Sequence, residues 1–279
     1  MTEEKTKKIV IFVLDSLLSN VVLEKIVNYY KEKIILICNS KRYGGKYGSF
    51  LNQVKKQYQR SGLGFIIYLS LNLELYKIFI WLVAIINKIL GRPQKIFSLK
   101  EIAGRYNIRI VNTAEINSPE TVGLLRELQP DLIISFYFDQ LIKKEILTIP
   151  KYGCVNLHPG ILPFYRGPFP VIWELIKGEK KLGATIHFMN EKLDEGPIIH
   201  KLPVELESDK SILYLEYKVF KEGTKLIIQT IKEINEGIVR SINQEKGSYY
   251  HSPTKTDLKE PRKRGYNLFR VKEFINLFI

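Results

Sequence analysis

The sequence contains very little cysteine and histidine. Cys38 and Cys154 are its two thiols among 279 residues, and both lie in apolar stretches. We interpret them as buried, reduced thiols of a cytoplasmic protein, which excludes a disulfide framework. Histidine occurs four times and no Cys-x-x-Cys motif is present. These absences argue against a histidine/cysteine metal centre, so we expect a site without a metal.

The sequence also lacks a long uncharged hydrophobic run. Its first residues carry mixed charges and a short apolar run, which is not the pattern of a signal peptide. The most apolar segment is 63–90, but Glu74 and Lys77 interrupt it, and a spanning helix needs ~20 apolar residues. We therefore expect a helix pair packed on the body or lying in a membrane interface. A homodimer surface is a third interpretation of the same apolar segment.

Acidic residues are too few to balance the basic ones. Lys and Arg number 43 against 29 Asp and Glu, which gives a formal charge of +14. Such an excess favours anionic partners, such as a nucleotide phosphate, an RNA backbone or an anionic membrane face. A lysine-rich codon bias in a soluble protein is the alternative explanation. Residues 41–60 contain six basic residues and no acidic one, and we expect them to form a glycine-bearing loop.

Hydrophobic residues are plentiful, at 45% of the chain, and their pattern predicts an α/β domain. Apolar runs at 9–14 and 34–38 have strand length, and a helical stretch at 20–31 separates them, which is typical of a βαβ unit in a parallel sheet. Further strands are expected at 109–111, 131–137, 155–157 and 184–189, and an amphipathic helix at 211–236. The catalytic domain would span 1–237, with an apolar helical insert at about 63–90, and 238–279 would be a short C-terminal extension.

The stretch VNLHPGILPFYRGPFP, residues 155–170, is the clearest candidate for a site. A strand delivers Asn156 and His158 into a Pro/Gly-rich loop, which suits a site at the carboxyl end of that strand. Further on, His187 lies on another expected strand and Asp194 follows seven residues later in a loop. Singly, each has an ordinary structural explanation, such as a core histidine or a turn aspartate. Their joint occurrence indicates a functional site.

These motifs resemble those of the folate-dependent formyltransferases, which act on glycinamide ribonucleotide, methionyl-tRNA and amino sugars. The resemblance covers roughly residues 8–237, with the insert as a departure. The residues that carry it are, in order, Asn156, His158, Pro159, Gly160, Leu162, Pro163, Tyr165, Arg166, Gly167, Thr185, His187, Leu193, Asp194, Gly196 and Pro197. It implies a Rossmann-like formyltransferase fold, with a mostly parallel twisted sheet flanked by helices.

By this resemblance the formyl donor is 10-formyltetrahydrofolate and the acceptor is a primary amine. Attack on the formyl carbon builds an oxyanion, so the Asn156 amide and a protonated His158 would donate hydrogen bonds to it. Asp194, within hydrogen-bond reach of His158, would orient that ring and favour its charged form. Either His158 or a water held by Asp194 would accept the proton of the amine. His187 and Thr185 would support the site.

The resemblance also places the folate pocket and groups that would bind the acceptor. The pteridine would lie between the loop after strand 131–137 and the residues before Asp194. The folate-binding residues are Phe138, Asp139, Gln140, Leu141, Ile142, Met189, Asn190 and Glu191. The acceptor-binding residues, which suit a phosphate or a ring, are Lys41, Arg42, Lys46, Arg166, Tyr249 and Tyr250.

The identity of the amine is less determined. No glycine follows the first strand, which argues against glycinamide ribonucleotide, and 42 residues after Gly237 are few for a tRNA-binding barrel. We expect an amino sugar on a nucleotide or lipid carrier, and segment 63–90 would lie against a membrane if the carrier is a lipid. A methionyl-tRNA formyltransferase-like enzyme and a non-catalytic folate-binding protein stay open as alternatives.

Overall fold

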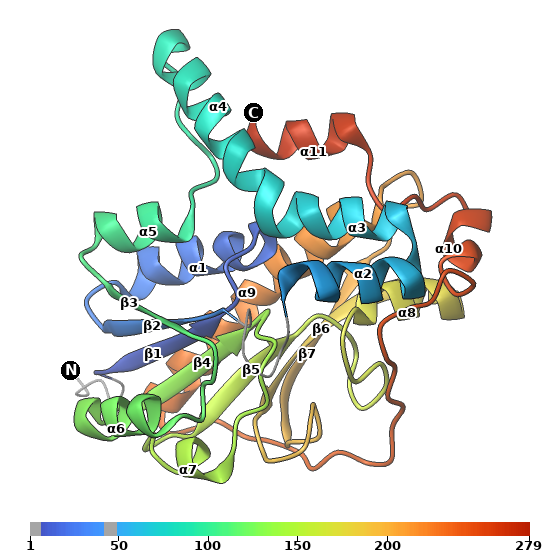
Figure 1. Cartoon of the computed structure of the whole chain (residues 1–279). Helices are drawn as coiled ribbons and strands as arrows, with labels where there is room; N and C mark the ends of the chain where they lie inside the picture. Colours follow the sequence, from blue (N-terminus) through green and yellow to red (C-terminus); the bar gives the residue numbers. More distant parts are fainter. Residues whose placement is uncertain (1–6, 42–48) are drawn as a thin grey trace.

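The computed structural model describes residues 7–41 and 49–279. Within them, seven strands form one sheet in the order β3-β2-β1-β4-β5-β6-β7 (Figure 1). The strands are β1 Ile9–Val13, β2 Ile34–Ser40, β3 Arg109–Thr113, β4 Leu132–Phe136, β5 Cys154–His158, β6 Lys181–Phe188 and β7 Ile198–Glu205. The first five run parallel, whereas β6 and β7 are antiparallel to their neighbours. This confirms the predicted Rossmann-like fold with a mostly parallel sheet.

Helices cover both faces of the sheet (Figure 1). One face carries α1 Leu17–Tyr30, α5 Leu99–Arg105, α8 Pro170–Lys177 and α9 Ile212–Glu236, and the other carries α6 Pro119–Leu128 and α7 Lys144–Leu147. Successive residues of β1 point to opposite faces, as in any strand. Ile9, Ile11 and Val13 therefore enter the larger core, and Val10 and Phe12 enter the smaller one.

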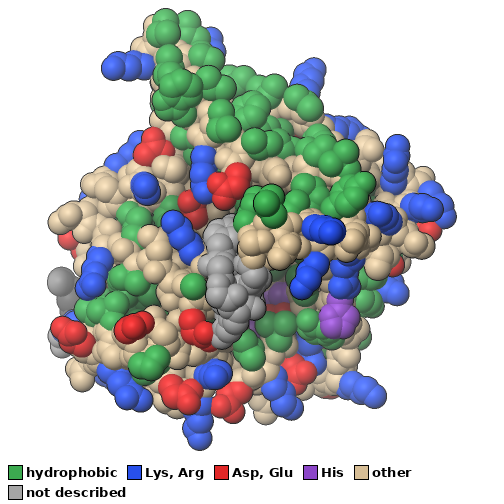
Figure 2. Space-filling model, in the orientation of Figure 1, with side chains coloured by type: hydrophobic (Ala, Val, Ile, Leu, Met, Phe, Trp, Pro, Cys, Tyr) green, Lys and Arg blue, Asp and Glu red, His purple; other side chains and the backbone are tan. Residues whose placement is uncertain are grey.

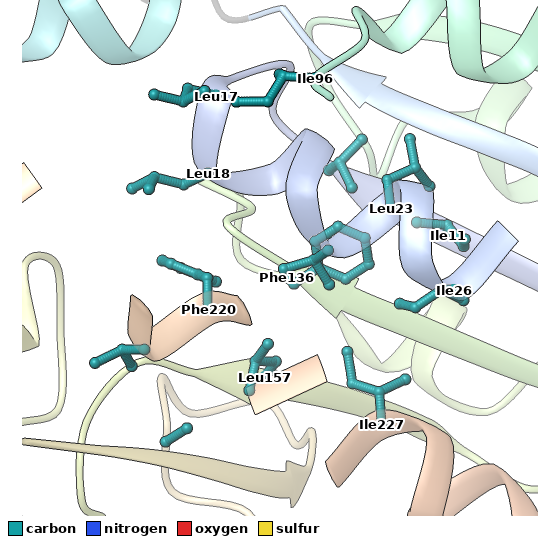
Figure 3. Close-up of a cluster of buried hydrophobic side chains, with 14 of the residues drawn as sticks. Ile11, Leu17, Leu18, Leu23, Ile26, Ile96, Phe136, Leu157, Phe220 and Ile227 are labelled. Carbon is teal, nitrogen blue, oxygen red and sulfur yellow. The ribbon is translucent and has the colours of Figure 1, made fainter. Parts of the chain in front are cut away.

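The larger core joins α1 and α9 to the middle of the sheet. Figure 3 shows Ile11, Phe136 and Leu157 from three strands beside Leu23 of α1 and Ile227 of α9. All of these side chains are at most 1% exposed. Burial of an aliphatic or aromatic side chain contributes about 1.5–3 kcal/mol, so this core fixes β4 and β5, whose carboxyl ends carry the candidate site.

The prediction of a loop over residues 41–60 is wrong for the second half of that range, which is helical. Helix α2 spans Phe50–Ser61, and the Ser49 hydroxyl caps it by accepting a hydrogen bond from the backbone N–H of Asn52 at 3.3 Å. The serine cap, together with a run free of glycine and proline, explains why a helix forms there. Arg42 and Lys46, two of the predicted acceptor-binding residues, lie outside the described residues.

The insert is also different from the helix pair expected. Residues 63–90 form one continuous helix, which consists of α3 Leu63–Ser70, a π-helical turn Leu71–Leu75 and α4 Tyr76–Leu90. No glycine or proline occurs between Phe65 and Leu90 to separate two helices. By length and composition alone, this helix is long and apolar enough to cross a membrane.

Buried polar bonds hold the first half of the insert on the body. Asn72 Oδ1 accepts the backbone N–H of Leu18 at 3.2 Å, in the first turn of α1. The Asn72 amide also donates to the Tyr137 hydroxyl at 2.5 Å, just beyond β4. Tyr76 donates to the Asp15 carboxylate, which follows β1. The insert therefore covers the carboxyl ends of β1 and β4 on one side.

The C-terminal residues lie against the α/β domain. Ile242 pairs with Ile198 of β7, and two short helices follow, α10 Lys259–Lys263 and α11 Val271–Phe278. Helix α11 lies beside α4, where the rings of Phe274 and Phe79 pack edge to face at 4.9 Å.

Asn72→Ala is expected to lower the free energy of unfolding by about 1–3 kcal/mol, because it leaves buried polar groups without partners. Asn52→Ala is the matched control, an asparagine on the exposed side of α2. Urea denaturation followed by circular dichroism measures both. Equal midpoints for the two variants would contradict the anchoring role of Asn72.

Candidate active site

The pairing of β5 with β6 assembles the predicted polar residues. In the antiparallel register, Asn156 lies opposite His187 and His158 lies opposite Thr185. The strand order reverses between β1 and β4, and β5 is the next strand beyond β4. Ligands of open α/β sheets bind outside the carboxyl ends of strands near such a reversal. The site therefore lies where this fold class places ligands.

His187 is a neutral ring that orients Asn156. His187 Nδ1 lies 2.8 Å from the carbonyl oxygen of Phe188, which only accepts, so Nδ1 carries the hydrogen. The unprotonated Nε2 then accepts from Asn156 Nδ2 at 3.2 Å. Burial, with a smaller contribution from His158, lowers the pKa of His187 to about 4, against the opposing effect of Asp194. His187 thus fixes which edge of the Asn156 amide is the donor edge.

His158 is buried between a carbonyl and a carboxylate. Its Nε2 lies 2.9 Å from the backbone oxygen of Tyr165 and donates to it. Its Nδ1 faces Asp194 Oδ1 at 3.6 Å, an ion-pair distance. The expected closeness of Asp194 is therefore present, although the separation is longer than a hydrogen bond. Since Nε2 donates to the oxygen of Tyr165, Nδ1 is the ring atom that faces the carboxylate.

Asp194 is held in a left-handed backbone conformation with φ of +55°. Such a conformation in a non-glycine residue costs about 1–3 kcal/mol and persists where its surroundings enforce it. The Gln244 amide donates to the backbone oxygens of Asp194 and Gly196 at 2.9 and 2.7 Å. Asp194 Oδ2 accepts the N–H of Gly167 at 2.9 Å. Sequence reasoning missed Gln244, because no motif marks a glutamine 50 residues beyond Asp194.

Gly167 and Gly196 of the motifs are required because the backbone of another segment approaches each of them closely. A Cβ on Gly196 would lie 1.8 Å from the oxygen of Phe188, and one on Gly167 would lie 2.2 Å from the oxygen of Tyr250. Gly167 also has φ of +99°, which glycine adopts without strain. Both glycines thus let the loops of His158 and Asp194 pack against their neighbours.

Hydrogen bonds from Thr185 and Glu174 fix the backbone of the loop after His158. The Thr185 hydroxyl donates to the oxygen of Gly160 at 2.6 Å and accepts from the N–H of Leu162 at 3.2 Å. Glu174 Oε1 accepts the N–H of Ile161 at 3.1 Å, while its Oε2 is buried without a hydrogen bond. Burial raises the pKa of Glu174 to about 8, so this side chain is a neutral acid near pH 7.

Arg166 connects the two loops of the site to the C-terminal segment. One terminal nitrogen of its guanidinium donates to Gln244 at 3.0 Å, and the other pairs with Glu195 at 3.1 Å. Both terminal nitrogens thus contact protein groups, whereas Nε is buried without a hydrogen bond. Lys41, by contrast, has an exposed side chain after β2.

The paired tyrosines of the extension lie over the same loop. The Tyr250 ring stacks on Trp173 at 4.5 Å and on Tyr165 at 5.8 Å, so protein rings already pack against it. Tyr249 is 47% exposed and pairs through its backbone with Arg166. Tyr249 is therefore the more accessible ring of the two, and ligand stacking stays a prediction for both.

The Ser40 side chain at the end of β2 and backbone groups at and after the end of β3 anchor the loop after β4. Gln140 accepts the N–H of Ile116 at 2.7 Å and donates to Ser40 at 2.8 Å, and the Ser40 hydroxyl donates to Asp139. Ile142 is fully buried in the smaller core. These residues hold the shape of the loop, which leaves its backbone and Leu141, 50% exposed, as the groups available to a ligand.

The other predicted folate-binding residues follow β6 or lie on the anchored loop. Phe138 packs against Phe12 with ring centroids 5.4 Å apart. The Met189 N–H donates to Cys154 at 2.7 Å, Asn190 accepts from a backbone N–H at 3.0 Å, and Glu191 is exposed. Their contacts with folate stay a prediction. In residues 7–41 and 49–279, no group of three or more His, Cys, Asp or Glu side chains is arranged to hold a metal.

Fold and site together define an α/β protein with an Asn–His–Asp site beyond the carboxyl end of a central strand. The family described as Formyl transferase matches residues 87–231, more than half of the chain. The chain therefore belongs to the formyl transferase family, as the motifs indicated.

Known relatives agree at the level of sequence and of fold. The chain is 37% identical over 163 residues to a methionyl-tRNA formyltransferase of Clostridium botulinum (strain Alaska E43 / Type E3), which is 57% of this chain and 53% of that protein. It therefore spans about half the length of this curated relative. In fold it resembles WlaRD, a sugar 3N-formyl transferase, with a TM-score of 0.55, 19% identity, and 88% and 70% of the two chains covered. It also resembles glycinamide ribonucleotide transformylase 1 of Symbiobacterium toebii, with a TM-score of 0.54, 18% identity, and 86% and 95% covered.

Glu174→Gln is expected to stabilise the protein at alkaline pH. Because the folded-state pKa of about 8 lies above the ordinary value of 4.5, the folded state binds more protons between these values. The stability of the parent protein therefore falls as pH rises through this window. Glutamine does not ionise, so the free energy of unfolding of the variant does not fall in this window. Its excess over that of the parent protein grows with pH and reaches the order of 1–4 kcal/mol above pH 8.

Thermal or urea unfolding across this pH window tests the expectation, with Glu236→Gln on the exposed side of α9 as the control. A Glu174→Gln advantage that does not change with pH would show that Glu174 is ionised in the folded protein.

Proposed function

We propose that this protein is an N-formyltransferase that transfers a formyl group from 10-formyltetrahydrofolate to a primary amine. The observation that carries the proposal is the convergence of Asn156, His158 and Asp194, with a neutral His187 behind the amide. A folate-binding protein without turnover needs no such set of an oriented amide donor, a buried imidazole and a carboxylate on a strained backbone. Membership of the formyl transferase family supports the same reaction.

The Asn156 amide stabilises negative charge on the formyl oxygen. One of its two N–H groups bonds His187, and the second N–H remains for the reacting oxygen. A donor that is already oriented stabilises developing charge without reorganisation, and loss of one such donor costs about 10²–10³ in kcat. 10-Formyltetrahydrofolate supplies the formyl group in this scheme.

His158 and Asp194 receive the proton that the amine loses on attack. His158 Nδ1 and Asp194 Oδ1 face one another at 3.6 Å, while Nε2 stays bonded to the oxygen of Tyr165. A proton that reaches this pair is shared between an imidazole and a carboxylate, and it then passes to the departing folate nitrogen. Proton transfer by a positioned group contributes about 10²–10⁴ to rate.

For the acceptor, we propose the amine of an amino sugar on a phosphate-bearing carrier. The exposed Tyr249 ring beside the motif loop and the exposed Lys41 support this choice, since they suit a ring and a phosphate. Glycinamide ribonucleotide fits less well. Asn72 and the Ser16 cap occupy N–H groups at the start of α1, where a helix would otherwise bind a phosphate.

Methionyl-tRNA is the second candidate acceptor. The observation that favours it is the 37% identity to the Clostridium botulinum protein of that name. The stretch of identity covers 53% of that relative, so the likeness supports the transfer reaction more directly than the acceptor.

Asn156→Ala and His158→Ala are each expected to lower the rate of formyl transfer at least a hundredfold, because they remove the oxyanion donor and the proton acceptor. Binding of 5-formyltetrahydrofolate, measured by calorimetry, should change only a few-fold. Asn52→Ala serves as a matched control on the surface. Full activity in either site variant would overturn the site, and folate binding without turnover in the parent protein would favour the non-catalytic alternative.

Release of tetrahydrofolate in the presence of different amines distinguishes the acceptors. We expect turnover with one of a panel of nucleotide-linked amino sugars and none with charged initiator methionyl-tRNA. Turnover with the tRNA and none with the sugars would transfer the assignment to the second candidate.

A further inference from the structure

The second half of the insert, α4, is apolar on its outer side as well as on its buried side. Its buried positions are Tyr76, Ile80 and Asn87, and its outer positions are apolar too. Helices on a water-facing surface normally bury the apolar stripe and expose the polar one. The residues that we call the α4 face are Leu75, Ile78, Trp81, Leu82, Ile85, Ile86, Ile89 and Leu90, which are 37–77% exposed. Figure 2 shows hydrophobic side chains gathered at the protruding end that α4 forms in Figure 1.

Exposed basic residues lie at the outer end of this apolar face, whereas the pair of Glu74 and Lys77 lies at its other end. From Tyr76 to Lys100 the sequence carries five lysines and arginines and no acidic residue. Lys77 is paired with Asp15 at 3.4 Å, but Lys88 and Arg92 at the end of the helix are exposed, as is Lys95 beyond it. An apolar stripe with neighbouring basic residues and an aromatic residue, here Trp81, is the composition of helices that lie in a membrane interface.

Contacts of the first half of the insert with the α/β domain argue against a helix that spans the bilayer. Asn72 and Tyr76 are bonded to the body, and the buried Tyr68 hydroxyl donates to Glu216 of α9. Extraction of these groups into hydrocarbon would break every one of these bonds. The part that protrudes, residues 78–90, is about 20 Å long at 1.5 Å per residue, shorter than a ~30 Å hydrocarbon core.

We propose that the α4 face inserts into one leaflet of a bilayer that contains anionic lipid and holds the protein at the membrane surface. Lys88, Arg92 and Lys95 then lie at the level of the negatively charged headgroups, each adding to the attraction. A second copy of this chain is the alternative occupant of the face, and the oligomeric state of the protein tests it.

The first test measures binding of the full chain to sucrose-loaded vesicles by co-sedimentation. We expect binding to vesicles of phosphatidylcholine mixed with phosphatidylglycerol, weaker binding to phosphatidylcholine alone, and a decrease with added salt. Ile89→Ser is expected to weaken partitioning roughly tenfold, since one aliphatic side chain leaves the hydrocarbon. Ile242→Ser is the matched control, because Ile89 and Ile242 are 77% and 78% exposed. It should bind as the parent does.

The second test uses the two tryptophans, Trp81 on the face and Trp173 on α8. In Trp173→Phe, the fluorescence of Trp81 should shift to the blue on addition of anionic vesicles and should be quenched by brominated lipid. These readouts measure contact with lipid and not formyl transfer, so they stand apart from the proposed function.

Three results would overturn the proposal. One is the absence of sedimentation with anionic vesicles, and another is an equal loss of binding in Ile89→Ser and Ile242→Ser. The third is a stable dimer in analytical ultracentrifugation that Ile89→Ser dissociates, with Trp81 unresponsive to vesicles, which would assign the face to a second copy.

Discussion

The antiparallel pairing of β5 with β6 is the constraint on which the candidate site depends. It sets Asn156 opposite His187 and His158 opposite Thr185, so one register decides four side chains at once. A shift of the register by one residue would turn these side chains to the other face of the sheet. The large apolar core on α1 and α9 holds that register, because Val155 and Leu157 alternate with the polar residues of β5 and are buried in it.

Much of this arrangement could be predicted from the sequence. Apolar runs of strand length predicted the parallel sheet, and the resemblance of the motifs to those of the formyltransferases implied that Asn156, His158 and Asp194 are neighbours. The distances could not be predicted. The 3.6 Å between His158 and Asp194 depends on Gln244, which holds the left-handed backbone of Asp194 from a segment that no motif marks.

The insert was misread for a related reason. Its composition predicted apolar helices, but hydropathy alone does not say which stripe of a helix faces the body. Here Asn72 and Tyr76 find buried partners around the start of α1 and the end of β1, and these bonds decide the orientation of the helix. Apolar positions of α4 therefore lie on the outer side as well as on the inner side, where Ile80 is buried, and the same contacts occupy N–H groups at the start of α1.

The central claim is that a neutral His187 orients the Asn156 amide toward the reacting oxygen. Nitrogen-15 NMR of the histidine side chains tests it most directly, with assignment by His187→Gln. From about pH 5 to about pH 8, the account predicts a His187 ring that stays neutral with its hydrogen on Nδ1. A His187 ring that titrates within this range, or that carries its hydrogen on Nε2, would contradict it.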